Sequence, residues 1–135
     1  MQNFIYAIIQ VIHNLGAVAV VGSAVSAIWL VRQDTMVQHR LAILMAAAWA
    51  IQAISGILFG ATTLFFDGQL PDIHGIAVDA LLIKIFCALV GFVLAAIYVR
   101  LNAGWPANKR FISWGMLLSP GVAALSSAAF LRWFS

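Results

Sequence analysis

The chain has 135 residues, of which 64% are hydrophobic and only 8% are charged. A soluble domain carries about 25% charged residues, so this composition predicts an integral membrane protein rather than a water-soluble one. The formal net charge of +3 comes from few side chains, and no basic patch is interleaved with aromatic residues, which argues against nucleic-acid binding. The single cysteine, Cys87, excludes an intrachain disulfide and a cysteine-based metal cluster.

Four apolar runs predict the fold. Crossing the hydrocarbon core takes about 20 residues, and each run is long enough; they cover residues 4–31, 41–66, 76–99 and 111–134. Because the connections are short, we predict an all-α, up-down-up-down four-helix bundle that forms one domain over residues 1–135. The first run has no Lys or Arg before it and is longer than a signal-peptide core, so we expect a retained helix.

The basic residues predict an orientation. Lys and Arg gather in the first and third connections, at Arg32, Arg40, Arg100, Lys109 and Arg110. The N-terminal tail and the second connection carry none. Because basic connections stay in the cytoplasm, we expect both termini on the outer, periplasmic side of a bacterial inner membrane. Tryptophan favours membrane interfaces, which places Trp29, Trp105 and Trp114 near the cytoplasmic interface and Trp133 near the outer one.

Two ionisable residues lie inside predicted spans, where such groups are costly, rare and usually functional. At the rise of an α-helix, His13 is about 14 Å from the outer end of the first span and Lys84 about 12 Å from the same side of the third. The two residues are therefore expected at nearly one depth, although the sequence does not show whether they face each other. A neutral histidine can bind a haem iron or relay protons, and a lysine cation can bind a carboxylate or tune a redox site.

Both residues also have a purely structural interpretation. His13 would then be a packing residue that bonds a carbonyl or Gln52, and Lys84 would extend to the outer interface. Two further residues are candidates for a cofactor site. Gln10 lies one turn before His13, and His74, before the third span, is a possible second metal ligand.

Small residues predict close helix packing. Gly56 and Gly60 form a Gly-x-x-x-Gly pair in the second span, and small residues let helix backbones approach closely in lipid. The contact can lie within the bundle or against another subunit. The expected partners are the lipid bilayer and other membrane subunits or a second copy of this chain.

Two local patterns resemble a known membrane domain. His13 is followed nine positions later by Gly22, in a helix that ends in Trp-Leu-Val-Arg at residues 29–32, and Leu-Leu-Ile-Lys at residues 81–84 lies in a helix that ends at Arg100. Together they resemble the domain shared by the copper-resistance protein D family and the four-helix bacterial protoporphyrinogen oxidase family. The resemblance implies binding of haem b or a porphyrin, with His13 as the iron ligand and Lys84 as its polar partner.

The expected function is binding of haem or a porphyrin near the outer leaflet, with a part in redox or haem-related chemistry. If the protein is an enzyme, we expect a porphyrinogen-oxidase-like or electron-transfer oxidoreductase with Lys84 as the catalytic candidate. The alternative is a non-catalytic accessory subunit of a larger membrane complex, without a cofactor of its own, which the short connections suit. A transporter is a third interpretation; small four-helix exporters depend on a membrane glutamate, which this chain lacks, and a copper relay would have only His13, His74 and Cys87.

Overall fold

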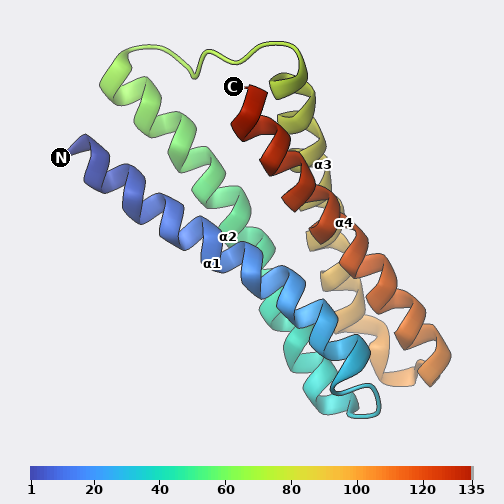
Figure 1. Ribbon diagram of the computed structural model, residues 1–135. Coiled ribbons are helices and arrows are strands. Elements are labelled where there is room, and N and C mark those ends of the chain that lie inside the picture. Colours follow the sequence, from blue (N-terminus) through green and yellow to red (C-terminus); the bar gives the residue numbers. More distant parts are fainter. Residues whose placement is uncertain (135) are drawn as a thin grey trace.

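The computed structural model describes residues 1–134 and consists almost entirely of helices. They are α1 (Gln2–Trp29), α2 (Thr35–Asp67), α3 (Ile76–Leu101), the short 3₁₀ turn η1 (Asn102–Gly104) and α4 (Ala107–Phe134) (Figure 1). No strand occurs within residues 1–134. All four α-helices are long and apolar enough to cross a membrane. The predicted all-α class is therefore confirmed, as are four helices with the length and apolar composition to cross a membrane.

The helices pack as two pairs. α1 lies against α2 and α3 against α4, while α2 also contacts α3 and α1 also contacts α4. The N-terminus, the end of α4 and residues 68–75 lie at one end, here called the termini end, and the other two connections lie at the opposite end, the basic end (Figure 1). Toward the termini end the α1–α2 pair diverges from the α3–α4 pair (Figure 1).

Two helices begin a full turn or more before their apolar runs. α2 begins at Thr35 because the Asp34 carboxylate accepts a hydrogen bond from the Val37 N–H at 3.0 Å, and aspartate is a favoured N-cap residue. Arg40 therefore lies within α2 rather than in the preceding connection. α4 likewise begins at Ala107, one turn before its predicted start. The first turn and a half of each helix includes polar residues, Gln38, His39 and Arg40 in α2 and Asn108, Lys109 and Arg110 in α4, which separate it from the apolar run from which the span was predicted.

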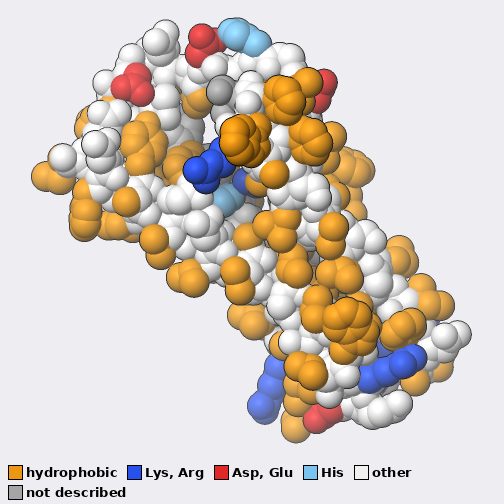
Figure 2. Space-filling model, in the orientation of Figure 1, with side chains coloured by type: hydrophobic (Ala, Val, Ile, Leu, Met, Phe, Trp, Pro, Cys, Tyr) orange, Lys and Arg blue, Asp and Glu red, His pale blue; other side chains and the backbone are white. Residues whose placement is uncertain are grey.

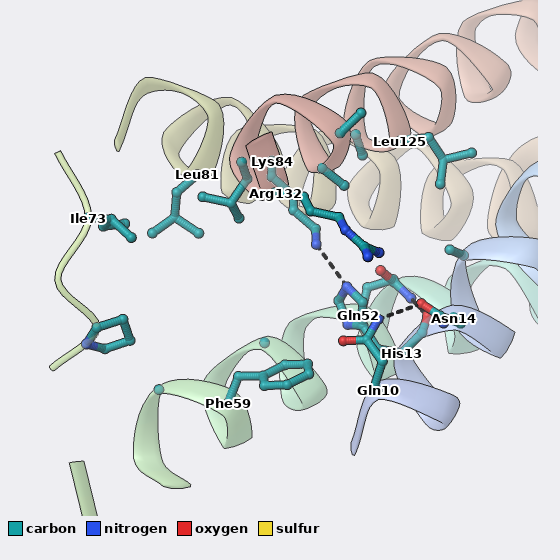
Figure 3. A pocket seen from close by; sticks show the side chains of 18 of the residues that line it. Gln10, His13, Asn14, Gln52, Phe59, Ile73, Leu81, Lys84, Leu125 and Arg132 are labelled. Atoms are coloured by element: carbon teal, nitrogen blue, oxygen red, sulfur yellow. Dashed lines mark hydrogen bonds between the residues drawn. The ribbon is translucent and has the colours of Figure 1, made fainter. Parts of the chain in front are cut away.

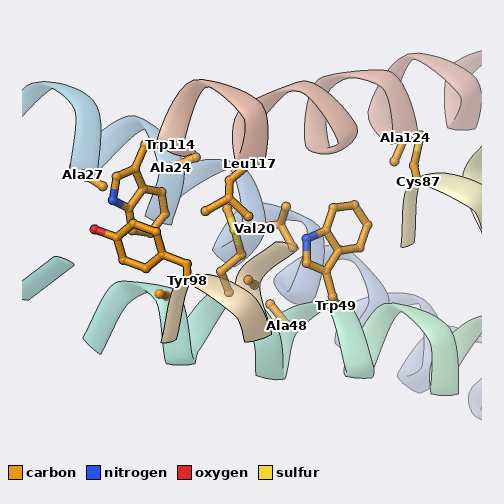
Figure 4. Close-up of a cluster of buried hydrophobic side chains, with 13 residues drawn as sticks. Val20, Ala24, Ala27, Ala48, Trp49, Cys87, Tyr98, Trp114, Leu117 and Ala124 are labelled. Atoms are coloured by element: carbon orange, nitrogen blue, oxygen red, sulfur yellow. The ribbon is translucent and has the colours of Figure 1, made fainter. Parts of the chain in front are cut away.

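Most of the buried hydrophobic cluster (Figure 4) comes from the halves of the helices nearer the basic end. Its largest fully buried side chains are Trp114, Tyr98, Met45 and Leu117. Trp114 is 0% exposed and its ring centroid is 5.0 Å from that of Tyr98, so it is a core residue whose ring packs inside the bundle. The rest of the core is mostly alanine, at positions 24, 27, 42, 48, 95 and 124, which lets the helices approach closely.

Polar side chains join three helices at the basic end. The buried Gln38 donates to the carbonyl oxygens of Ala27 at 3.3 Å and Arg32 at 3.2 Å, and it accepts from the Tyr98 hydroxyl at 3.1 Å. Asn102 donates to the Tyr98 carbonyl at 2.6 Å. These bonds fix α1, α2 and α3 together at the end opposite the divergence, so the bundle is closed at one end and open at the other.

Candidate functional site

A cavity lies between the diverging helices, with a volume of about 1310 Å³. Small-molecule sites usually enclose about 300–1,000 Å³. All four α-helices and residues 70–73 contribute to its mostly apolar walls. Figure 2 shows it as a hollow in which histidine and basic side chains are visible. The polar residues that line it include Gln10, His13, Gln52, Lys84 and Arg132.

The structure brings the two predicted membrane residues together. Lys84 Nζ lies 2.8 Å from His13 Nε2 (Figure 3), so the two side chains meet at one level of the bundle. α1 and α3 are not among the closely packed helix pairs, so the two side chains meet across the cavity. Lys84 therefore reaches inward to His13 rather than extending to the outer interface.

A chain of hydrogen bonds defines the state of the His13 ring. Ser55 Oγ donates to the Ile51 carbonyl at 2.6 Å and lies 2.6 Å from His13 Nδ1. A serine hydroxyl has one proton to donate; when this proton is directed to the Ile51 carbonyl, Nδ1 is the donor in its bond with Ser55. A lysine ammonium has only donors, so Nε2 accepts and the ring is neutral. With Lys84 charged and the His13 ring neutral, the pair holds one positive charge, which lies on Lys84 Nζ.

Gln52 holds the backbone rather than the ring of His13. Its side-chain amide donates to the His13 carbonyl oxygen, and Gly16 leaves room for this amide, because an added Cβ would lie 2.6 Å from Gln52 Nε2. We expected Gln52 to bond the His13 side chain, and it bonds the His13 backbone carbonyl instead. The ring partner is Ser55, which the sequence analysis missed; its position three residues after Gln52 places it on the same face of α2.

The other two predicted site residues have different partners. Gln10 lines the cavity and donates to Asn14 Oδ1 at 2.8 Å, not to the His13 ring (Figure 3). His74 is in the connection before α3; its side chain is 84% exposed and lies 2.6 Å from the Asp72 carboxylate. His74 does not line the cavity. Among residues 1–134 no group of three His, Cys, Asp or Glu side chains is placed to hold a metal ion, so His13 is the candidate ligand that faces the cavity.

Two features of the cavity were not predicted. The Arg132 side chain extends from α4 into the same part of the cavity as Lys84 (Figure 3). Gly56 and Gly60 line the cavity, and no atom within 4 Å would meet a Cβ added at either position. The predicted packing of this glycine pair within the bundle is therefore not formed in the described part of the chain. The pair instead leaves one wall of the cavity without side chains, here called the glycine wall.

Comparison with known proteins adds no relative: no family model, curated protein or solved structure matches this chain. The functional argument therefore depends on the geometry of the cavity and on the chemistry of the side chains within it.

Proposed function

We propose that this chain is a multi-pass protein of a bacterial inner membrane that binds haem b or a porphyrin near the outer leaflet and takes part in redox or haem-related chemistry. One observation carries the proposal: a buried histidine is fixed at Nδ1 by Ser55, and its Nε2 faces a large, mostly apolar cavity. Proteins commonly present a metal-binding histidine in this way, with one ring nitrogen held by a hydrogen bond and the other turned to the metal.

The charge distribution supports an orientation with both termini outside. Five basic residues lie at or near the basic end, namely Arg32, Arg40, Arg100, Lys109 and Arg110. Acidic Asp67 and Asp72 lie at the termini end, and Figure 2 shows red acidic side chains at that end. The positive-inside rule then favours a cytoplasmic basic end. In this orientation the cavity opens toward the periplasm.

The polar side chains of the cavity fit a tetrapyrrole. His13 would hold the iron, Ser55 would orient the ring, and Lys84 and Arg132 would face acid groups of the ligand. Iron ligation requires Lys84 to leave Nε2, where it lies 2.8 Å away, whereas a metal-free porphyrin requires no such change. Bound haem would supply one-electron redox chemistry. The His13–Lys84 pair would accept or deliver a proton at the cavity wall.

The test is an absorption spectrum of the detergent-purified protein, oxidised and dithionite-reduced. We expect a Soret band that shifts on reduction and is lost in His13→Ala. His39→Ala is the matched control, because His39 lies in α2 near the basic end and bonds Asn102 rather than the cavity residues. A colourless protein after expression with ample haem would contradict haem binding and favour the accessory subunit.

A further inference from the structure

We infer that Lys84 and Arg132 form an anion anchor that receives the carboxylate or phosphate groups of a flat, largely apolar ligand. This inference deepens the proposed function and rests on it, because it names the charge and shape of the molecule that enters the same cavity. Arg132 is the new element: it lies near the end of α4, far in the sequence from His13 and Lys84, and the bundle brings it to them (Figure 3).

The cationic side chains in the cavity outnumber the acidic ones, which favours an anionic ligand. Two cationic side chains enter it, and the one acidic residue among its lining residues, Asp72, is already paired with His74 at 2.6 Å. Within residues 1–134 neither Lys84 nor Arg132 makes an ion pair. Like charges repel each other. Lys84 lies inside a membrane-spanning helix, where a cation without a counter-ion is costly, whereas Arg132 is exposed near the end of α4. An anion between the two side chains would remove both penalties.

The shape of the cavity favours a flat, apolar ligand. On the α2 side, Gly56 and Gly60 present open backbone, and on the α4 side the lining residues include Ala128 and Ala129. Small residues on facing helices leave a broad space that a flat apolar body can fill. The ligand would lie with one face on the glycine wall and with its acid groups toward Lys84 and Arg132. A uniformly polar solute would leave these apolar walls unmatched.

The charge of the ligand can be tested with a metal-free dicarboxylic porphyrin and its dimethyl ester, titrated into the purified protein and followed by porphyrin fluorescence. We expect the acid to bind about tenfold tighter than the ester, since hydrogen bonds to charged groups have that magnitude. Arg132→Gln and Lys84→Met should each remove most of this preference. Arg100→Gln is the matched control, because Arg100 is exposed at the other end of the bundle. Equal affinity for acid and ester, or an unchanged preference in Arg132→Gln, would overturn the anchor.

The glycine wall has its own test. Gly56→Leu places a side chain in open space within the cavity, and Gly22→Leu does the same on an exposed face of α1 outside it. We expect Gly56→Leu to weaken binding of both acid and ester, because it fills the space of the apolar body, and Gly22→Leu to leave both affinities unchanged. Unchanged binding in Gly56→Leu would overturn the placement of the ligand on this wall.

The probe contains no iron, so the two proposals can fail separately. Acid-selective binding without a His13-dependent haem spectrum would contradict the haem proposal alone, and a haem spectrum without acid selectivity would contradict the anchor alone. Repeating the titration in nanodiscs of phosphatidylcholine or phosphatidylglycerol identifies the source of the anion. Competition by the anionic lipid would support an anchor filled by a lipid headgroup, and unchanged affinity would support an anchor filled by the free ligand.

Discussion

At the scale of single residues, the ring of His13 is tolerated inside the bundle because both of its nitrogens have partners. The side chain is only 8% exposed, and a buried polar group without a hydrogen bond costs about 1–3 kcal/mol. Nδ1 is hydrogen-bonded to the Ser55 hydroxyl, and Nε2 is hydrogen-bonded to Lys84 Nζ. The same two bonds that remove this penalty also aim the ring at the cavity, so stability and the proposed site depend on the same atoms.

Ser55→Ala should therefore be costly. Removing the hydroxyl leaves Nδ1 without an acceptor, and we expect a loss of about 1–3 kcal/mol in the free energy of unfolding. If haem binds at His13, its affinity should also fall about 10- to 100-fold, as is usual when the partner of a ligating histidine is removed.

The measurement is denaturant unfolding in detergent, combined with haem titration. Ser119→Ala is the control, because this exposed serine bonds only the Gly115 carbonyl of its own helix; we expect a change within about 0.5 kcal/mol. Similar results for the two variants would mean that Ser55 does not hold His13.

At the scale of helices, α2 and α3 pack closely where the Trp49 ring of α2 lies against Gly91 of α3. A Cβ added at Gly91 would overlap three atoms of the Trp49 indole ring, Cε2, Nε1 and Cζ2. Trp49 is 2% exposed and belongs to the buried hydrophobic cluster, and a ring in a packed core cannot turn aside cheaply. Gly91 thus sets the separation of α2 and α3, which in turn sets how far Lys84 must reach toward His13.

Alanine at two glycines should have opposite effects. We expect Gly91→Ala to lower the free energy of unfolding by about 1–3 kcal/mol through overpacking against Trp49. Gly115→Ala meets no atom within 4 Å, and replacing a glycine inside a helix should raise it by roughly 0.5–1 kcal/mol. Unfolding of both variants in one detergent measures the contrast; a neutral Gly91→Ala would show that the Trp49 ring has room to move.

At the scale of the whole molecule, the distribution of Lys and Arg residues predicts on which side of the membrane the cavity opens. The basic end carries most of the Lys and Arg residues, while Lys84 and Arg132 lie in the cavity toward the other end. If the basic end is cytoplasmic, as the positive-inside rule favours, these two cations stand in the outer half of the membrane. An anionic ligand would then enter from the periplasm or from the outer leaflet.

The orientation can be measured by cysteine labelling. Cys87 is buried, so a Cys87→Ala background is a suitable host for one new cysteine at a time. Gln69→Cys, in the connection at the termini end, should react with a membrane-impermeant maleimide in intact spheroplasts. Gln33→Cys, at the basic end, should react only after the membrane is permeabilised. Both positions are exposed, so the reverse pattern would mean that both termini face the cytoplasm.

The sequence by itself determined the spans and the depth of the special residues. Hydropathy identifies an apolar run whatever surrounds it, and the fixed rise of a helix places His13 and Lys84 at one level. Only the tertiary structure decided which helix faces meet. In lipid an outward face is as apolar as a packed one, so these sequences carry little information about rotation around the helix axis. That is why Ser55 and Arg132 were missed, and why Gly56 and Gly60 were expected in a helix contact but line a cavity.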